Sequence, residues 1–263
     1  YIKMEVDERR EPGAFWLTGS QQFHLMRGVS ESLAGRVGII NLMGISEQEL
    51  RGRPRAGSFL PVPHKLEERK PAAPLYLNEL YLRIWRGYFP GLHGGTPPDR
   101  DLFYSSYLQT YLQRDVRDLA RVGDERDFLR FLRACATRTA QLLNIHDLCR
   151  DADISHPTGK RWLSILCATG LVYLLEPWHS NVTKPLYFYR DKDRREIDLL
   201  IHSDGELYPL EIKKTASPSA EAVRHFAALN RLRIPIGPGG LICLAGQRLP
   251  LTPSVEIIPV GHI

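Results

Sequence analysis

Four charged residues interrupt an otherwise apolar stretch near the carboxyl end of the chain. Glu196, Asp198, Glu211 and Lys213 lie within EIDLLIHSDGELYPLEIKK, residues 196–214. Two carboxylates about 5 Å apart at Cβ can share one Mg²⁺, which takes oxygen ligands and keeps several waters. A lysine two residues after the second carboxylate could orient an attacking water or neutralise charge that develops on a phosphate. These residue types therefore allow metal-dependent cleavage of a phosphate ester.

Two strands joined by a tight turn are predicted to position these residues. Asp204-Gly205 is a strong signal for a two-residue hairpin turn, and a turn centred there pairs residues whose numbers sum to about 409. Asp198 then faces Glu211, Glu196 faces Lys213, and the acidic pair and the lysine share a solvent-open face. The other face is predicted to be apolar and consists of Ile197, Leu199, Ile201, Tyr208, Leu210 and Ile212.

Directly opposed like charges destabilise a pair of strands, so the placement of Asp198 against Glu211 needs an explanation. Either water screens the two charges on a solvated face, or a divalent cation bridges them. Without a cation, their repulsion is expected to raise the pKa of at least one carboxyl group. The spacing D-x(12)-E-x-K has the form found in the PD-(D/E)XK nuclease fold, with Asp198 and Glu211 as metal ligands and Lys213 as the lysine. The residues alone leave both explanations open.

A second candidate site lies in residues 141–178, where a short helix, a tight turn, a second helix and a strand are predicted. This order is typical of a helix-turn-helix followed by a wing. The second helix begins with residues that can reach phosphates or base edges. They are Ser155, His156, Thr158, Lys160 and Arg161. The alternative is that the module packs between domains and its basic residues are merely solvated.

A third candidate site lies in the first 46 residues. Residues 14–20 and 37–46 are predicted to contain adjacent parallel strands joined by a helix, with further partner strands outside this chain. Polar residues at the carboxyl edge of a parallel strand are where open α/β sheets bind ligands. The candidates are Thr18, Ser20 and Gln21, together with Arg36 as a contact for a phosphate. The sequence contains no G-x-x-x-x-G-K-[ST] phosphate loop.

The whole chain has the composition of an ordinary globular protein with a mild basic surplus. Its net charge is +5, which permits a nucleic-acid partner without requiring one. Its four cysteines lie in apolar surroundings without metal-type spacing, which indicates reduced core residues of a cytoplasmic protein. No apolar run reaches the length of a membrane span. Residues 78–133 show helical periodicity and predict a small helical bundle.

Three long stretches of the sequence resemble one large prokaryotic family, the AAA-type ATPases with an uncharacterised C-terminal domain. The stretches begin at FWLTGSQQFHLMRGVSE, at YLQTYLQRDVRDLARV and at LYFYRDKDRREIDLLI. The resemblance implies an α/β multi-domain protein that binds ATP and Mg²⁺. It implies part of a P-loop AAA-type core in 1–75, a helical lid or linker in 76–135, a winged helix-turn-helix in 136–184 and a restriction-endonuclease-like α/β domain in 185–263.

The resemblance also implies site residues and shows two departures. In such ATPases the strand ending in LTGSQ carries the polar sensor of the terminal phosphate, a role that would fall to Thr18, Ser20 or Gln21. The family's phosphate-binding loop and acidic strand precede the position of Tyr1 and are absent here. SNVTK runs directly into PLYFYR, so we expect missing residues between Lys184 and Pro185, including a helix that supplies another acidic residue.

The function expected from these observations is that of an ATP-binding AAA-type ATPase whose winged-helix and nuclease-like regions act on nucleic acid. DNA is expected as the substrate in preference to RNA. The alternative is a nucleotide-regulated binding module whose nuclease-like fold is catalytically inactive. We expect a cytoplasmic protein without a membrane partner, and self-association into a homo-oligomer is left open. This chain alone is not expected to hydrolyse ATP, because it contains no phosphate loop.

Overall fold

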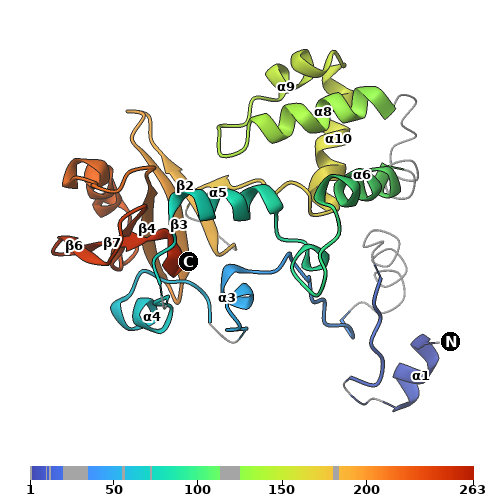
Figure 1. Ribbon diagram of the computed structural model, residues 1–263, viewed down its shortest axis with the longest axis horizontal. Helices are drawn as coiled ribbons and strands as arrows, with labels where there is room; N and C mark the ends of the chain where they lie inside the picture. Colours follow the sequence, from blue (N-terminus) through green and yellow to red (C-terminus); the bar gives the residue numbers. More distant parts are fainter. Residues whose placement is uncertain are drawn as a thin grey trace. The chain divides into compact units, whose positions relative to one another are not determined.

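The computed structural model describes residues 2–9, 11, 13–19, 35–54, 57–71, 73–112, 125–179 and 184–263 (Figure 1). The chain divides into two compact units, each made of two separate segments. One unit comprises residues 1–42 and 99–174, and the other comprises residues 43–98 and 175–263. We call them the helical unit and the sheet unit and describe each by itself. This division does not test the four predicted domain boundaries, which stay predictions.

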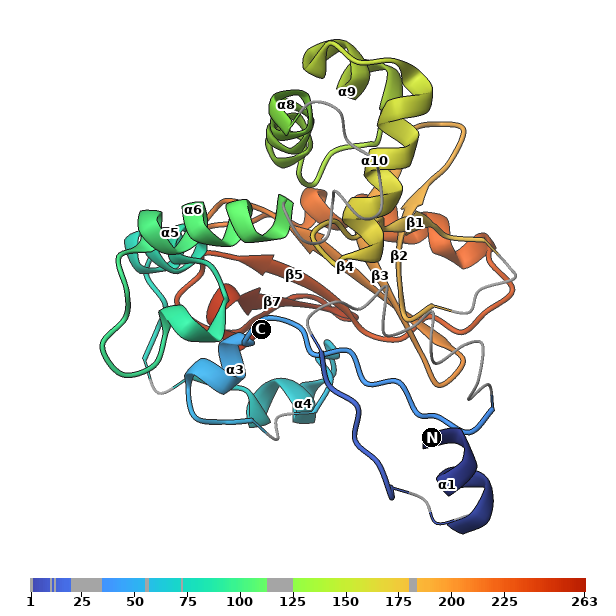
Figure 2. The same ribbon diagram turned by 90° about the vertical axis from the view of Figure 1, so that its right-hand side faces the viewer.

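The sheet unit is built on a mixed seven-stranded sheet with the strand order β1-β2-β3-β4-β5-β7-β6 (Figure 2). β2, β3 and β4 form an antiparallel meander, β5 and β7 continue in parallel from β4, and β6 returns antiparallel beside β7. The strands are β1 (Glu176–Pro177), β2 (Leu186–Arg190), β3 (Glu196–Ser203), β4 (Glu206–Ile212), β5 (Gly239–Cys243), β6 (Leu249–Thr252) and β7 (Val255–Pro259). The predicted mixed sheet is therefore confirmed.

Both faces of this sheet are covered. On one face, Leu66 of α4 (Pro63–Glu68) packs with Leu210, Ile242 and Ile258. On the other face, Leu229 of the 3₁₀ helix η3 (Ala220–Arg231) packs with side chains of β2, β3 and β4. The remaining elements of the unit are α3 (Glu47–Leu50), α5 (Leu77–Arg86), η1 (Pro90–Leu92) and η4 (Val260–His262).

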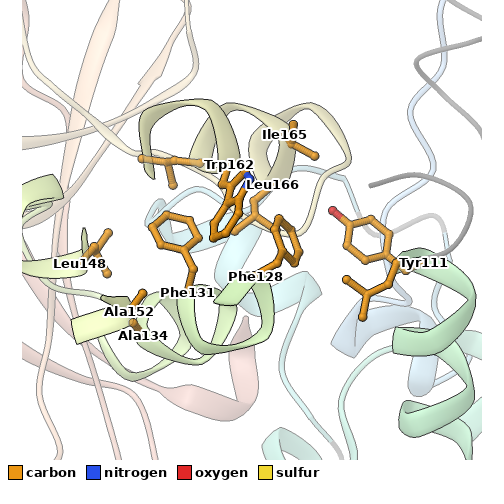
Figure 3. Close-up of a cluster of buried hydrophobic side chains, with 11 residues drawn as sticks. Tyr111, Phe128, Phe131, Ala134, Leu148, Ala152, Trp162, Ile165 and Leu166 are labelled. Carbon is orange, nitrogen blue, oxygen red and sulfur yellow. The ribbon is translucent and has the colours of Figure 1, made fainter. Parts of the chain in front are cut away.

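The helical unit has an aromatic core. Trp162 meets Phe128 and Phe131 edge to face, with ring centroids 5.2 and 5.8 Å apart, and Leu148 and Leu166 complete the cluster (Figure 3). Its elements are α1 (Ile2–Arg9), α6 (Arg100–Tyr111), α8 (Glu125–Thr137), α9 (Ile145–Ala152) and α10 (His156–Ala168). Helices predicted within 78–133 are confirmed where the structure describes them.

α9 and α10 are joined by a three-residue turn. Asp153 adopts the left-handed conformation, with φ of 53°, and ends α9. Ser155 caps the first turn of α10 by accepting a hydrogen bond from the amide of Thr158. The predicted helix, tight turn and second helix are thus present. Among the described residues that follow α10, β1 pairs in parallel with β2, and the predicted wing stays a prediction.

Two predictions are wrong. Lys184 and Pro185 are consecutive residues at the start of β2, where the Lys184 amide donates to the Tyr187 hydroxyl at 2.6 Å and the Pro185 carbonyl accepts from the amide of His202 at 2.8 Å. There is no break between them. Residues 15–19 and 37–43 form no strand. Two parallel strands lack the ladder partners and the covered faces that stabilise such a sheet.

The exposed apolar residues of these amino-terminal segments agree with this explanation. Trp16 is 82% exposed and Leu42 is 86% exposed. Within the described part of the chain, no helix combines the length and the apolar character needed to cross a bilayer.

Candidate active site at the end of the β3–β4 hairpin

The β3–β4 hairpin has the predicted register. Its paired residues run from Ser203 with Glu206 to Leu199 with Leu210, and each pair sums to 409. Asp204 and Gly205 have φ values of 51° and 81°, as the mirror-image turns of two-residue hairpins require. The register prediction is therefore confirmed over the paired residues.

β3 bulges where the first carboxylate lies. Asp198 and Leu199 together oppose the single residue Phe188 of β2, so β3 contains one extra residue at this point. The flanking pairs are Tyr187 with Leu200 and Tyr189 with Ile197. The Asp198 Oδ2 atom accepts a hydrogen bond from the backbone amide of Ile212 at 2.8 Å. Bulges re-aim side chains and are frequent beside active sites, and here the bulge directs a carboxylate at the end of β4.

The second carboxylate is buried, which corrects one prediction. Glu211 is 7% exposed, although a solvent-open face was predicted. It pairs in register with Leu241 of β5, whose side chain packs with Val223 of η3. β5 and η3 cover this side of the hairpin, and neither is encoded in the local pattern of the hairpin. Ile212, predicted to lie in the core, is 53% exposed at the end of β4.

Lys213 is held against Glu211. Its Nζ lies 2.5 Å from Glu211 Oε1, and its backbone amide donates to the carbonyl of Ile242 at 3.0 Å. The Lys213 side chain is 43% exposed, so the ion pair lies at the border between core and solvent. The structure therefore brings Asp198, Glu211 and Lys213 together at one end of the hairpin. Glu196 takes a different partner and forms an ion pair with Arg190 at 2.8 Å.

The surroundings shift the pKa of both members of this ion pair upward. Burial raises the pKa of Glu211 most, the hydrogen bond from Lys213 opposes this, and the negative charge of Asp198 raises it further. The hydrogen bond to Glu211 raises the pKa of Lys213. The expectation that one carboxyl pKa rises is confirmed, but its first cause is burial and repulsion is a smaller one. Lys213 therefore stays a cation at neutral pH.

The donor set fits a weakly held Mg²⁺ ion. The Ile212 amide donates to one oxygen of Asp198, and Glu211 receives hydrogen bonds from Lys213 and from the backbone of Asp198. Mg²⁺ is commonly bound through one or two carboxylates and keeps waters at its other positions. Among the described residues there is no group of three or more histidine, cysteine and acidic side chains that could hold a metal. The candidate ligands at this site are the carboxylates of Asp198 and Glu211.

The residues predicted at the start of α10 divide into two pairs. The Thr158 hydroxyl lies 2.8 Å from that of Ser155, and the ring of His156 stacks on that of His146 at 4.3 Å. Burial, with smaller effects from His146 and Lys160, lowers the pKa of His156. Lys160 and Arg161 are exposed and form no salt bridge with any residue that the structure describes. Lys160 and Arg161 are thus the two cations of this set that are open to a phosphate backbone.

The residues predicted to contact a nucleotide are less well placed. Thr18 is exposed in a segment without strand structure. Ser20 and Gln21 lie outside the described residues. Arg36 forms an ion pair with Asp7, and both side chains are partly exposed. The assignment of these residues to one nucleotide site stays a prediction.

Sequence reasoning missed the bulge in β3 and the hydrogen bond from Ile212 to Asp198. A one-residue mismatch between β2 and β3 leaves no composition signal, because both strands remain apolar. The predicted Asp204-Gly205 turn determines the register between β3 and β4 but carries no information about the register between β2 and β3. Sequence reasoning also missed β6 and β7, because residues 249–259 contain three prolines and turn residues that weaken the strand pattern.

Comparison with known families places three matches along the chain. Residues 1–51 match an AAA domain, residues 77–191 match a domain of unknown function (DUF8612), and residues 174–263 match a domain of unknown function (DUF4143). The matches at the two ends of the chain support an AAA-type ATPase-like family. The third match begins near β1 and contains the whole β3–β4 hairpin with its acidic pair.

Two curated relatives align with the whole chain. They are the uncharacterized proteins Mb2031c of Mycobacterium bovis and Rv2008c of Mycobacterium tuberculosis, each 22% identical to this chain. The alignment covers 100% of this chain and 65% of each relative, so the chain spans about two thirds of their length. No solved structure matches the chain.

Proposed function

We propose that the sheet unit is a divalent-cation-dependent phosphodiesterase that acts on nucleic acid, within an ATP-binding protein of the AAA-type ATPase-like family. The observation that carries the proposal is the convergence of Asp198, Glu211 and Lys213 at the bulged end of the hairpin. The spacing of these residues along the chain and the turn between the two strands have the form of the PD-(D/E)XK nuclease fold.

Each residue has a distinct role in this proposal. Asp198 and Glu211 would hold the cation, which would supply the charge that activates a water and stabilises the phosphate. Lys213 contributes a positive charge beside the scissile phosphate, since its raised pKa keeps the ammonium protonated. Hydrolysis joins the oxygen of water to phosphorus and breaks one ester bond, and the leaving oxygen takes up a proton. The ammonium of Lys213 is positioned to stabilise the charge that develops on the phosphate.

Nucleic acid is also the proposed ligand of α10. Lys160 and Arg161 would contact phosphates, and His156 and Thr158 would lie beside them at the first turn of the helix. Removing both cations in the Lys160→Ala, Arg161→Ala double variant should weaken binding about equally for all sequences and reduce its salt dependence. Unchanged binding by this variant would show that the helix is only a packing module.

For the amino-terminal part we propose ATP with Mg²⁺ as the ligand, contacted by Thr18, Ser20 or Gln21 and by Arg36. The match of residues 1–51 to an AAA domain supports this assignment. A cytoplasmic location and a DNA rather than an RNA substrate belong to the same proposal, and assembly into a homo-oligomer is compatible with it. Without a phosphate loop, this chain alone should not hydrolyse ATP.

A second candidate function is nucleotide-regulated binding without cleavage. The observation that favours it is the ion pair between Lys213 and the buried Glu211, which already neutralises one carboxylate without any metal. In this case Glu211 and Lys213 would form a structural ion pair, and the protein would bind nucleic acid without cleaving it.

Cleavage assays separate these two functions. We expect the 263-residue chain to cleave labelled single-stranded or double-stranded DNA with Mg²⁺ or Mn²⁺ and to lose this activity with a chelator. Asp198→Asn and Lys213→Ala should each lower the rate at least about a hundredfold, the usual cost of removing a group that stabilises the transition state. Binding without cleavage of DNA or RNA by the wild type would favour the second function.

A further inference from the structure

The turn between β2 and β3 presents a surplus of positive charge next to the candidate active site. Residues 190–196 read RDKDRRE, and Arg231 at the end of η3 lies beside them. This surface contains five cations and three carboxylates. The cations are Arg190, Lys192, Arg194, Arg195 and Arg231, and the carboxylates are Asp191, Asp193 and Glu196.

Only two of the five cations form salt bridges with the carboxylates of this surface, although Asp191 also interacts electrostatically with Arg231. Arg190 pairs with Glu196 at 2.8 Å, and Arg195 pairs with Asp193 at 3.2 Å. The three other cations are exposed and form no salt bridge with any described residue. They are Lys192, Arg194 and Arg231, which we call the cation triad.

A network around Asp191 fixes the backbone of this turn. Its carboxylate accepts hydrogen bonds from the amides of Asp193 and Arg195 at 2.9 and 3.0 Å. The hydrogen bond from Arg195 is the main cause that holds the pKa of Asp191 below its ordinary value, so the carboxylate stays ionised at neutral pH. Arg194 is held at a φ of 59°, a conformation that few residues other than glycine adopt. The turn therefore presents Lys192 and Arg194 from a pre-organised backbone.

Arg231 belongs to the same surface through packing. Leu229 and Leu232, which flank it, pack in one cluster with Tyr189 of β2. Tyr189 pairs with Ile197, the neighbour of Asp198 in β3. η3 also covers the sheet face on which Glu211 lies. The triad thus flanks the carboxylate site on the side of η3 and of the β2–β3 turn.

The distance along β3 matches a polymer better than a single nucleotide. Asp198 lies four positions after Arg194, a span of at most roughly 13 Å at the rise of a strand. One strand of B-DNA carries a phosphate about every 3.4 Å along its axis, so a span of this length extends beyond a single nucleotide. A phosphate at the carboxylate site would therefore leave further phosphates of the same strand over the triad.

We propose that Lys192, Arg194 and Arg231 form a binding surface for the phosphate backbone of a nucleic acid strand that enters the Asp198–Glu211 site. This proposal rests on the proposed function, and it adds a second contact surface that is separate from α10. Binding through the triad is independent of sequence, because it uses charge and not base edges. It identifies the substrate as a nucleic acid strand of several nucleotides.

The test is binding of fluorescent DNA and RNA oligonucleotides to the 263-residue chain in a chelator, so that no cleavage occurs. The variant is Lys192→Gln, Arg194→Asn, Arg231→Gln, in which asparagine tolerates the left-handed conformation of residue 194. We expect at least about tenfold weaker binding at low salt, equal for unrelated sequences, and a salt slope smaller by about 2 to 3. An unchanged melting temperature shows that the variant is folded.

A matched control separates the triad from net charge. Arg53→Gln, Lys65→Gln, Lys70→Gln removes the same three charges around α4, which covers the opposite face of the sheet. This control should bind within about twofold of the wild type. An equal loss in both variants, or no loss in the triad variant, would overturn the proposal. Stronger attachment of the wild type to vesicles of anionic lipid than to either nucleic acid would overturn it too.

The two proposals fail in different ways. If the wild type binds nucleic acid but does not cleave it with Mn²⁺, while the triad variant binds weakly, the proposed active site is contradicted and the proposed binding surface is supported. If the wild type cleaves and the triad variant binds and cleaves equally well, the proposed binding surface is contradicted and the proposed active site is supported.

Discussion

The carboxyl-terminal hairpin and the amino-terminal apolar segments were both predicted to form strands, and of the two only the hairpin forms them in the structure. β3 and β4 pair with each other and with β2 and β5, and both of their faces are covered. Residues 15–19 and 37–43 have comparable apolar content but no strand structure and large exposed side chains. Apolar composition makes a strand only where ladder partners and covering elements are present.

Truncation of a leucine in each region should show this difference most strongly. Leu210 is fully buried, so Leu210→Ala should destabilise the sheet unit by about 2–5 kcal/mol. Leu42 is 86% exposed, so Leu42→Ala, the same chemical change, should alter stability by about 0.5 kcal/mol or less. Urea unfolding measures the change in unfolding free energy of both variants, provided that their m-values equal that of the wild type. A cost above about 2 kcal/mol for Leu42→Ala would show that the amino-terminal segment is packed like the hairpin.

The turn that sets the hairpin register can be tested by a smaller change. Gly205 has a φ of 81° and open space at its Cβ position, so Gly205→Ala should cost about 1–2 kcal/mol through backbone strain alone. Gly57 also has open space at its Cβ position but does not have a positive φ, so Gly57→Ala serves as the control and should cost less than about 0.5 kcal/mol. Equal effects in thermal unfolding would contradict the assigned turn.

The pH dependence of stability tests the burial of Glu211. Its pKa is raised in the folded state, mainly by burial, so its contribution to stability is fully present below the unfolded pKa near 4.5 and is lost as pH rises through the raised value. The melting temperature of the wild type relative to Glu211→Gln should therefore fall as the pH increases from below 4.5 towards neutrality. A relative melting temperature that rises over this range would show that Lys213 overcompensates for burial.

The hairpin and its site show which features a local pattern can predict. Asp204-Gly205 gave the β3–β4 register, and the register gave the approach of Asp198 to Glu211, because both depend on residues close in sequence. The burial of Glu211 depends on β5 and η3, which follow later in the chain and leave no mark on the alternation within β4. The bulge at Asp198 depends on the register between β2 and β3, which no turn residue in the sequence indicates.

The helical unit gives the same lesson. The short helix, tight turn and second helix were predicted from residues close in sequence, and the structure contains all three. A strand partner is set by contacts across the sheet, and β1 joins β2 at the edge of the sheet. The stacking of His156 on His146 also depends on contacts between two helices, so sequence position alone could not reveal it.

The central claim, that Asp198 and Glu211 form a divalent-cation site, is tested most directly by thermal unfolding of the 263-residue chain with and without Mn²⁺. At a hundredfold excess over the dissociation constant, binding should stabilise the wild type by about 2.7 kcal/mol. Asp198→Asn should lose this gain, while Asp204→Asn, the same substitution at the hairpin turn, should keep it. Equal Mn²⁺ shifts in wild type and Asp198→Asn, or no shift in either, would contradict the account and leave the three residues as a structural ion pair.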